Sequence, residues 1–485
     1  MLQNWMVVMA ALVYLTALFA IAHVGESRGK RLMSGPLRPA IYALTLGVYC
    51  TSWTFLGSVG LSSRTGYDFL PIYIGPIIVV GFCAFFIRRI VMLAKANNIA
   101  SIADFVASRY GKNQGVAATV TLIAVIGVVP YIALQLKAIS ASLEVFLNAS
   151  TGVSVGVAAA PIFGDISLLV ALILAFFAMV FGTRQVDTTE HQDGLMIAIA
   201  VESAIKLVAF LAAGLFVVWW LFDGPGDLLT KVAARADVAS IFSKEPDWSL
   251  WFTMTLLSAG AIVMLPRQFH VAVIENRDPS DIRRAAWMFP LYLIAINLFV
   301  VPIAMAGLLT FPDGAIDRDL TVLSLPLRDG AGALALFVLI GGLSAATAMV
   351  IVECVALAIM ISNDLFMPLV LSRRNGVNLK DMGSMILLVR RVSIMLVLLM
   401  GYAYYRASGD AALASIGLLA FAAIAQIGPA LIGGLYWHRA NARGAIAGLL
   451  TGFAFWVYTL LLPSLSPGNV WLDAIAGQGL SFIQG

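Results

Sequence analysis

Apolar runs alternate with short polar segments along almost the whole chain of 485 residues. About twelve of these runs approach or exceed roughly twenty residues, the length that an α-helix needs to cross the hydrocarbon core of a bilayer. The polar segments between them are too short to form a separate soluble domain. The pattern predicts an all-α, multi-pass membrane protein whose spans are 4–23, 37–61, 69–93, 115–146, 166–182, 194–222, 251–269, 288–309, 332–362, 385–405, 412–437 and 444–462.

The composition supports this interpretation. Hydrophobic residues make up 61% of the chain, charged residues only 12%, and the mean hydropathy is +0.95, well outside the range of soluble domains. Lys and Arg concentrate in alternate loops, and basic loops stay on the cytoplasmic side. We therefore expect a protein of the bacterial inner (plasma) membrane with its N-terminus outside. The net charge of +4 reflects topology, so a lipid bilayer is the expected partner and nucleic acid is not.

Two spans depart from the lipid-facing pattern. Gly47–Gly57 (GVYCTSWTFLG) and Gly341–Met349 (GGLSAATAM) carry small, hydroxylated and aromatic residues, which is typical of loosened helices around a protein-lined cavity. Close helix packing is the alternative explanation. A sodium ion prefers oxygen ligands, which the carbonyls of an unwound helix and hydroxyls such as Ser344 and Thr347 could supply.

Ionisable residues inside spans are the next candidates, because a charge in hydrocarbon is costly unless it is paired. Glu202 and Lys206 are four residues apart, which predicts an ion pair along one helix. Lys137 has no partner nearby in the sequence, so we expect it to face a cavity or to pair with Glu353. We interpret Arg267, at the predicted inward end of the seventh span, as a topological anchor, with a sensing role as the alternative.

Enzyme classes find little support in the sequence. We identify no nucleotide-binding loop, no HExxH motif and no kinase domain. The three cysteines all lie in apolar spans without metal-ligand spacing, which predicts packing roles. We therefore expect no catalytic residues and no cofactor, apart from a possible sodium ion.

Several motifs resemble a known family. The string GPALIGGLYWHRANARGAIAGLLTG, Gly428–Gly452, resembles the closing signature of the sodium:solute symporter family, and ASIADFVASRYG, Ala100–Gly111, resembles the amphipathic stretch after that family's third helix. More narrowly, YCTSWTFLGSVG, LPRQFHVAVIEN, GGLSAATAMVIVE and ISNDLFMPLVL resemble the symporter-like N-terminal membrane region of certain sensor histidine kinases. The resemblance covers nearly the whole chain.

This resemblance implies a five-plus-five inverted-repeat, LeuT-like fold, with the second to sixth spans in one repeat and the seventh to eleventh in the other. In such folds the first helix of each repeat is discontinuous at the bilayer midplane, here in the spans around Thr51 and Ser258. The expected domains are a peripheral N-terminal helix and inward loop (1–36), the transporter core (37–440), and a peripheral C-terminal helix with an outward tail (441–485).

The resemblance also implies binding sites. A sodium ion would be held by Gly47, Cys50, Gly341, Ser344 and Ala345. The solute would lie beside Thr51, Ser52 and Trp53, facing Gln135 and Ser258. The chain departs from the sodium/proline symporter pattern because Tyr49 stands where that symporter has an aspartate, and Ala345 where it has a hydroxyl residue. These differences weaken the case for tight sodium binding and leave proton coupling open.

Two functional hypotheses follow. The first is a transporter that moves a small organic solute, an amino acid or a short carboxylate, with sodium by alternating access. The second is a solute-sensing input module of a sensor histidine kinase system, with a histidine kinase or response regulator as partner and the kinase part absent from this chain. With an outward C-terminus at Gly485, a cytoplasmic kinase in cis needs a thirteenth span that the sequence does not contain. We expect the transporter.

Overall fold

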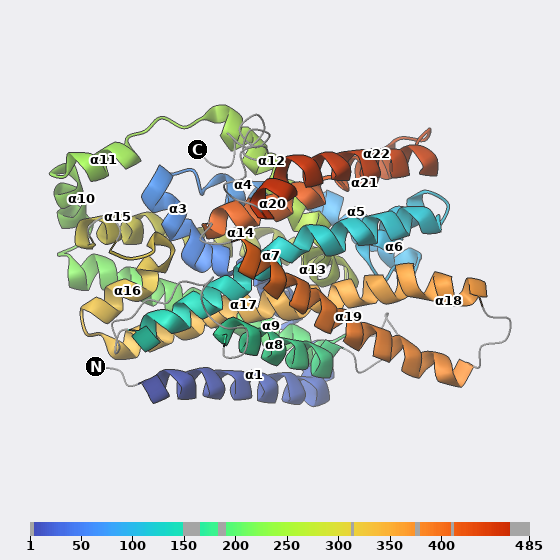
Figure 1. The fold of residues 1–485 in the computed structure, drawn as a ribbon, viewed down its shortest axis with the longest axis horizontal. Helices are drawn as coiled ribbons and strands as arrows, with labels where there is room; N and C mark the ends of the chain where they lie inside the picture. Colours follow the sequence, from blue (N-terminus) through green and yellow to red (C-terminus); the bar gives the residue numbers. More distant parts are fainter. Residues whose placement is uncertain are drawn as a thin grey trace.

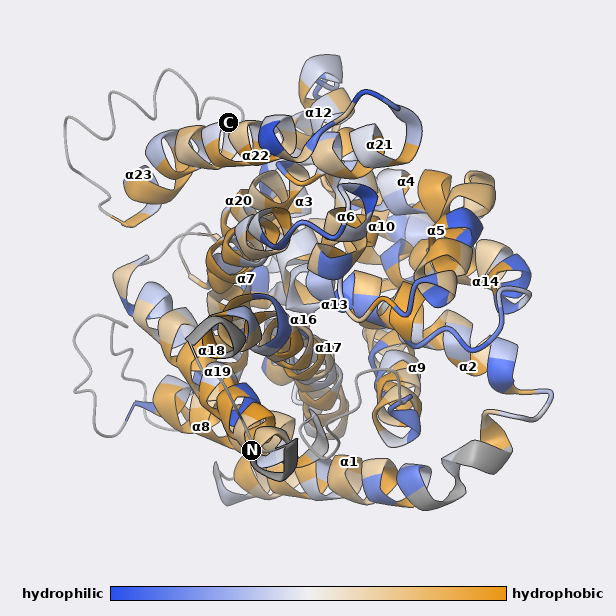
Figure 2. Cartoon of the chain, turned by 90° about the vertical axis from the view of Figure 1, so that its right-hand side faces the viewer, coloured by the Kyte–Doolittle hydropathy of each residue, from blue (hydrophilic) through white to orange (hydrophobic). Residues whose placement is uncertain are grey.

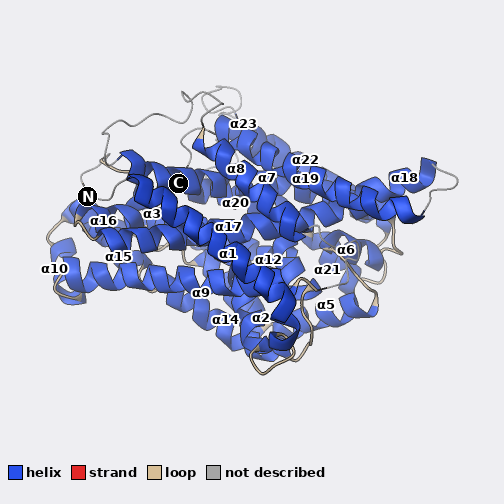
Figure 3. Cartoon of the chain, turned by 90° about the horizontal axis from the view of Figure 1, so that it is seen from below, coloured by secondary structure: helices blue, strands red, loops and turns tan. Residues whose placement is uncertain are grey.

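The computed structural model describes residues 4–148, 165–182, 191–311, 315–373, 379–408 and 412–465. Within them every regular element is helical (Figure 3), and the long helices run along the long axis of the molecule (Figure 1). Eight helices are long and apolar enough to cross a membrane, or up to eleven if each of three bent pairs counts as one span, and α8 (Ile166–Gly182) is a shorter apolar helix. The expected all-α, multi-pass architecture is confirmed.

The helices before the middle of the chain build the first group of spans. Their bounds are α1 (Asn4–Leu32), α2 (Arg38–Thr45), η1 (Leu46–Tyr49), η2 (Trp53–Gly57), α3 (Ser58–Thr65), α4 (Pro71–Pro76), η3 (Ile77–Phe82), α5 (Ala84–Ala96), α6 (Ile102–Arg109), α7 (Gln114–Asn148), α8, α9 (Asp193–Phe216) and η5 (Val217–Leu221).

The second group begins after two short helices, α10 (Pro225–Ala233) and α11 (Ala236–Phe242). It contains α12 (Trp248–Met264), α13 (Pro266–Phe269), η6 (His270–Ile274), α14 (Asp281–Asn297), α15 (Val300–Thr310), η7 (Arg318–Leu320), α16 (Thr321–Arg328), α17 (Gly332–Met360), η8 (Ile361–Phe366), α18 (Met367–Arg373), α19 (Leu379–Ala407), α20 (Leu413–Ala425), α21 (Gly428–Tyr436), α22 (Ala442–Trp456), η9 (Val457–Leu461) and α23 (Leu462–Leu465).

Helices rich in apolar residues, coloured orange in Figure 2, lie at the outer flanks of the bundle. Phe82 is 78% exposed and Phe252 71%, whereas Lys206, Arg267 and Glu353 are fully buried. Apolar surface of this extent is unusual for a soluble monomer and suits contact with lipid, where polar groups must be satisfied inside the protein. The polar side chains in the interior are therefore the place to look for a site.

Two spans break near the centre of the bundle. The helix formed by α2 and η1 bends by 67° into η2 and α3, because Cys50 adopts an extended backbone with ψ 96°. The helix α12 bends by 53° into α13 and η6, because Leu265 is extended with ψ 133° and precedes Pro266, which disfavours a helical residue before it. The expected break near Thr51 is confirmed. The expected discontinuous span around Ser258 is confirmed as well; Ser258 itself lies in regular helix, and the break falls about two turns later, at Leu265.

The helix α1 lies at one edge of the molecule (Figure 1) and packs closely on α9. A methyl group added to Gly194 would lie 2.3 Å from the carbonyl oxygen of Ala22, so only glycine permits this approach. The assignment of 1–36 and 441–485 to separate peripheral domains stays a prediction, and the C-terminal tail from 466 onward lies outside the described residues.

Candidate functional site

The first break exposes backbone oxygen atoms that the expected sodium site would use. The bend interrupts the helical hydrogen-bond ladder, so the carbonyls at the end of the first half-helix are available to other donors. The ammonium group of Lys206, on α9, donates to the carbonyl oxygens of Gly47 and Cys50, at 2.7 Å from each. A cationic group of this chain therefore lies at the position predicted for sodium.

The predicted ion pair between Glu202 and Lys206 is wrong. Neither side chain contacts the other within hydrogen-bond distance, although both belong to the described residues. The Glu202 carboxylate instead accepts hydrogen bonds from the hydroxyls of Tyr14, at 2.5 Å, and Thr347, at 2.6 Å. Each charged group is instead bound by partners on other helices: α1 and α17 for the carboxylate, and the broken helix for the ammonium.

The other predicted sodium ligands lie on α17, which is regular helix over 29 residues. The Ser344 hydroxyl donates to the backbone carbonyl of Glu202 at 2.8 Å. A methyl group added to Gly341 would lie 2.5 Å from the Cβ of Ala209, so this face packs tightly on α9, and Ala345 is buried on the same helix. The structure thus brings α17 and α9 together beside Lys206, with Ser344 already engaged by a neighbouring carbonyl.

The second break positions a buried arginine. Arg267 Nη1 lies 2.6 Å from Glu353 Oε2, and both side chains are fully buried. The guanidinium carbon is 4.5 Å from the centre of the Tyr131 ring, within the range of a cation–π contact. The interpretation of Arg267 as an anchor is wrong, because its side chain is fully buried and paired with Glu353. The expected alternative pairing of Lys137 with Glu353 is also not observed.

Several polar atoms around this pair are buried and have no hydrogen-bond partner within the described part of the chain. They are Arg267 Nε and Nη2, Glu353 Oε1, Ser52 Oγ, and both polar atoms of the Gln268 side-chain amide. Buried polar groups are nearly always hydrogen-bonded in folded proteins, so each exception calls for an explanation. The cluster has capacity to bind a polar molecule.

Three of the predicted solute residues lie together next to this arginine. The Thr51 hydroxyl is 3.0 Å from the Tyr131 hydroxyl, and Tyr131 carries the guanidinium of Arg267 on its ring. The backbone N–H of Ser52 donates to Gln135 Oε1 at 3.1 Å. The first amide of the second half-helix is therefore occupied by a neutral side-chain oxygen from α7.

Trp53 fills space in an aromatic group with Tyr131 and Phe421. Its ring centre is 5.2 Å from that of Phe421, and Tyr131 stacks on Phe421 at 5.7 Å. A methyl group added to Gly57 or to Gly417 would lie 2.7 Å from the indole, so the indole is closely packed between its own helix, η2, and α20. In this conformation the Trp53 side chain therefore contributes to helix packing.

The structure does not bring Ser258 to this cluster. Its hydroxyl donates to the carbonyl of Pro71 at 2.9 Å, at the contact between α12 and α4. A methyl group added to Gly75 would lie 2.1 Å from the Ser258 hydroxyl oxygen. Ser258 therefore serves the packing of these two helices in the conformation observed.

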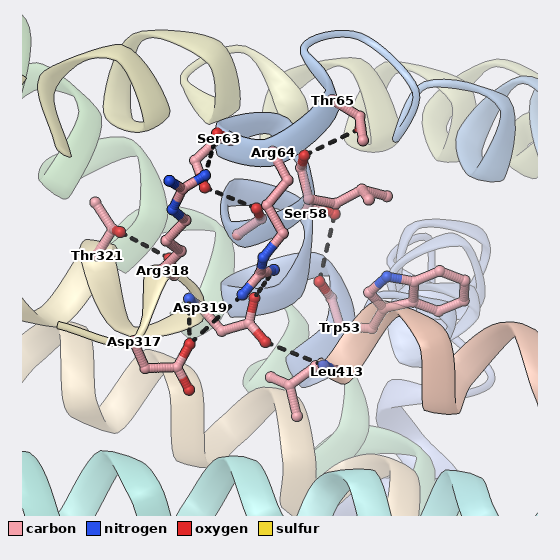
Figure 4. Close-up of polar contacts among 12 residues, drawn as sticks. Trp53, Ser58, Ser63, Arg64, Thr65, Asp317, Arg318, Asp319, Thr321 and Leu413 are labelled. Carbon is pink, nitrogen blue, oxygen red and sulfur yellow. Dashed lines mark hydrogen bonds and ion pairs between the residues drawn. The ribbon is translucent and has the colours of Figure 1, made fainter. Parts of the chain in front are cut away.

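A polar latch joins three elements at the end of the molecule predicted to face outside (Figure 4). Asp319, on η7, accepts a hydrogen bond from Arg64 Nη1 at 2.8 Å and from the backbone N–H of Leu413 at 3.0 Å. Arg318 donates to the carbonyl of Ser63 at 3.0 Å. Burial raises the pKa of the Asp319 carboxyl, although the Arg64 guanidinium acts in the opposite direction. We call Arg64, Asp319 and the Leu413 amide the outer latch; sequence reasoning missed it.

The opposite end carries a second polar group. The buried carboxylate of Glu275 lies 3.4 Å from both His191 Nδ1 and His270 Nε2. Burial alone would raise the pKa of Glu275, but its electrostatic contacts with these two histidines lower it to about 2. Arg38 forms ion pairs with Asp281 at 2.9 Å and with Asp278 at 3.2 Å. Both ends of the bundle are therefore held by charged contacts in this conformation.

Comparisons with known proteins give a consistent result. No family model matches the chain. The uncharacterized symporter YodF of Bacillus subtilis is 26% identical over 417 residues, which cover 83% of this chain and 76% of YodF. The uncharacterized symporter YhjB of the same organism is 25% identical over 298 residues, covering 59% of this chain and 55% of YhjB, a little more than half of that protein's length.

The structural comparison shows the fold. A substrate-bound, outward-open structure of a Na⁺-coupled sialic acid symporter matches with a TM-score of 0.67, covering 99% of this chain and 96% of that chain at 13% sequence identity. The expected LeuT-like inverted-repeat fold is therefore confirmed. The relatives named here are symporters, and they give no support to the narrower resemblance to kinase-linked membrane regions. The chain has the fold of a secondary transporter.

Proposed function

We propose that this chain binds a small organic solute that carries a carboxylate group, such as an amino acid or a short carboxylic acid, and translocates it by alternating access in symport with a cation. The transporter fold and the two relatives named as symporters support transport. Transport of this kind makes the chain a carrier and not an enzyme.

The observation that carries the proposal is the state of Arg267. Its guanidinium is fully buried, forms one bond to Glu353, and keeps Nε and Nη2 without a partner among the described residues. A guanidinium presents its donors in a planar fork that matches a carboxylate. Because the side chain lies at the second helix break, a solute carboxylate would meet it at the centre of the bundle.

The first break supplies the second half of the proposed solute site. Thr51 and the Ser52 amide lie next to Tyr131, on which Arg267 stacks. Gln135 now occupies the Ser52 amide, and an anionic oxygen of a solute would be a stronger acceptor than this neutral amide oxygen. The proposed site is therefore Thr51, Ser52, Gln135 and Arg267, with Trp53 forming part of its packed wall.

Sodium is the coupling cation that we propose first. The fold neighbour is a Na⁺-coupled symporter, and the carbonyls of Gly47 and Cys50 already converge on one cationic group. Ser344, Gly341 and Ala345 would complete the site from α17. The presence of Lys206 between the two carbonyls bears on this assignment and is taken up below.

The orientation and the cellular context belong to the proposal too. With the N-terminus outside, the outer latch faces the outside and Glu275 faces the inside of a bacterial plasma membrane. The alternative role as a solute-sensing module with a histidine kinase rests on the quoted motifs alone.

Uptake into proteoliposomes tests the function. We expect the purified protein to accumulate at least one radiolabelled amino acid or short carboxylate when a sodium gradient is imposed, and to lose that uptake in Arg267→Gln/Glu353→Gln, which removes both buried charges together. Gln135→Leu should weaken the apparent affinity, while Ser258→Ala, which alters only the contact of α12 with α4, should not. Wild-type uptake by a folded double variant would contradict the assignment of Arg267.

A further inference from the structure

The cation position at the first helix break is filled by a group of the chain itself. Lys206 is fully buried, and its Nζ lies 2.7 Å from both the Gly47 and the Cys50 carbonyl oxygens. An ammonium with three donors fits between backbone carbonyls in the way a small cation does. These two carbonyls are also the backbone ligands expected for sodium.

Sodium and this ammonium cannot occupy the position together. Both carry one positive charge, both would need the same oxygen atoms, and like charges at contact distance repel strongly where water is excluded. Glu202, on the same helix, forms no hydrogen-bonded pair with the lysine, because its Oε1 is bound by Tyr14 and Thr347.

Close packing holds α9 against the first half-helix next to Lys206. A methyl group added to Gly47 would lie 2.8 Å from the Ser203 hydroxyl oxygen on α9, so the first half-helix and α9 are in direct contact just where the lysine extends. The Tyr292 hydroxyl donates to the carbonyl of Ser203 at 2.9 Å and ties α14 to the same region. The helix segment that carries the lysine is therefore fixed against the first half-helix.

We propose that Lys206 is a tethered competitor of sodium: its ammonium holds the carbonyls of Gly47 and Cys50, and a sodium ion binds there only when the lysine withdraws or is absent. The inference rests on the proposed assignment of these carbonyls to sodium. It makes Lys206 the residue that sets the sodium affinity of the site, and it requires the lysine to move during any sodium-coupled cycle. Removing the ammonium while keeping its apolar stem should create a stronger sodium site.

Sodium-dependent thermal stabilisation of the purified protein tests the proposal without any solute, so its outcome is independent of whether the proposed transport is found. Unfolding is followed during titration of sodium chloride against choline chloride at constant ionic strength. We expect the half-maximal sodium concentration to fall at least about tenfold in Lys206→Met relative to the wild type, the change that corresponds to about 1.4 kcal/mol of binding free energy. Lys231→Met, which removes an exposed ammonium bound to Asp227, should behave as the wild type.

Two further variants secure the interpretation. Lys206→Gln removes the charge but keeps a polar group, and provides the same test if Lys206→Met does not fold. Adding Ser344→Ala to Lys206→Met should reverse part of the gain, because a hydroxyl oxygen expected to face the ion is lost. Equal sodium responses of the wild type and both Lys206 variants, whether all strong or all undetectable, would overturn the proposal.

Discussion

Each of the two helix breaks is formed by one residue with an extended backbone, but the polar groups at the two breaks have different partners. At the first break, two carbonyl oxygens bind the ammonium of Lys206 at 2.7 Å each. At the second, Arg267 is bound by the carboxylate of Glu353 at 2.6 Å and still keeps two nitrogen atoms, Nε and Nη2, without a partner among the described residues. One break is satisfied by the chain itself, and the other is left with free donor capacity.

This difference separates two kinds of binding site. Backbone carbonyls attract a cation, and a lysine already supplies one, so an external cation has to displace it. A buried guanidinium with unpartnered N–H groups attracts an anion, and at Nε and Nη2 of Arg267 the anion replaces no hydrogen bond of the described chain. We therefore expect a solute carboxylate to bind at the second break more readily than sodium at the first.

The largest expected effect comes from breaking the buried pair at the second break. Arg267→Ala leaves the Glu353 carboxylate buried without its partner, which should lower the free energy of unfolding by about 3–5 kcal/mol. Arg267→Gln combined with Glu353→Gln should recover most of this loss, because no uncompensated charge remains. Thermal unfolding in detergent measures both, and a single variant as stable as the wild type would show that Arg267 is not desolvated as described.

A smaller effect is expected at the outer latch. Asp319→Asn weakens the charge-assisted hydrogen bond with Arg64 and should favour opening by about 1.5–3 kcal/mol. A reporter cysteine at Ser62, which is fully buried, should then be alkylated faster by a membrane-impermeant maleimide. Asp317→Asn is the matched control, since Asp317 is half-exposed and 3.7 Å from Arg64. Equal alkylation rates in both variants would show that the contact between Asp319 and Arg64 does not keep this end of the bundle closed.

The same latch can be opened without changing a charge. A methyl group added to Gly60 would lie 1.7 Å from Asp319 Oδ1, so Gly60→Ala should displace the carboxylate at a cost of about 1–3 kcal/mol. Gly226→Ala, where nothing lies within 4 Å of the added methyl, is the control and should be neutral. The Ser62 reporter measures the outcome, and slow alkylation in Gly60→Ala would mean that Asp319 adapts in place.

The smallest effect is expected from the hydrogen bond that joins Tyr14 on α1 to Glu202 on α9. Tyr14→Phe removes one of two hydroxyl donors to Glu202, while Thr347 keeps the other. We expect a loss of only about 0.5–1.5 kcal/mol, because the Thr347 hydroxyl still donates to the same carboxylate oxygen; it should be visible as a small decrease in melting temperature. A large loss would instead indicate that α1 is essential to the core.

The first break was predictable from the amino-acid composition of its span. Small, hydroxylated and aromatic residues around Cys50 and Thr51 are unusual in a lipid-facing helix, and the structure bends there. The second break has no such composition. Its signal was Pro266 followed by Arg267 in the middle of an apolar stretch, but the same two residues also suit the end of a span, and the sequence alone does not distinguish a buried arginine from an anchor.

The hydrogen-bond partners of the buried charged residues were harder to predict. Spacing along one helix correctly placed Glu202 and Lys206 on the same side of α9, yet each is bound by groups far away in the sequence: Tyr14 and Thr347 for the carboxylate, Gly47 and Cys50 for the ammonium. The outer latch was missed for the same reason, since Arg64, Asp319 and Leu413 belong to three distant segments. Such pairings depend on tertiary packing, which local patterns do not encode.

The most direct test of the account is a structure of the wild-type protein with a transported carboxylate bound, determined by electron cryo-microscopy. The account predicts density for the solute between the two breaks, with its carboxylate bonded to Arg267 Nε or Nη2 and its remainder beside Thr51 and Gln135. Solute density at another position, with Arg267 bonded only to Glu353, would contradict the claim that the second break is the anion-binding half of the site.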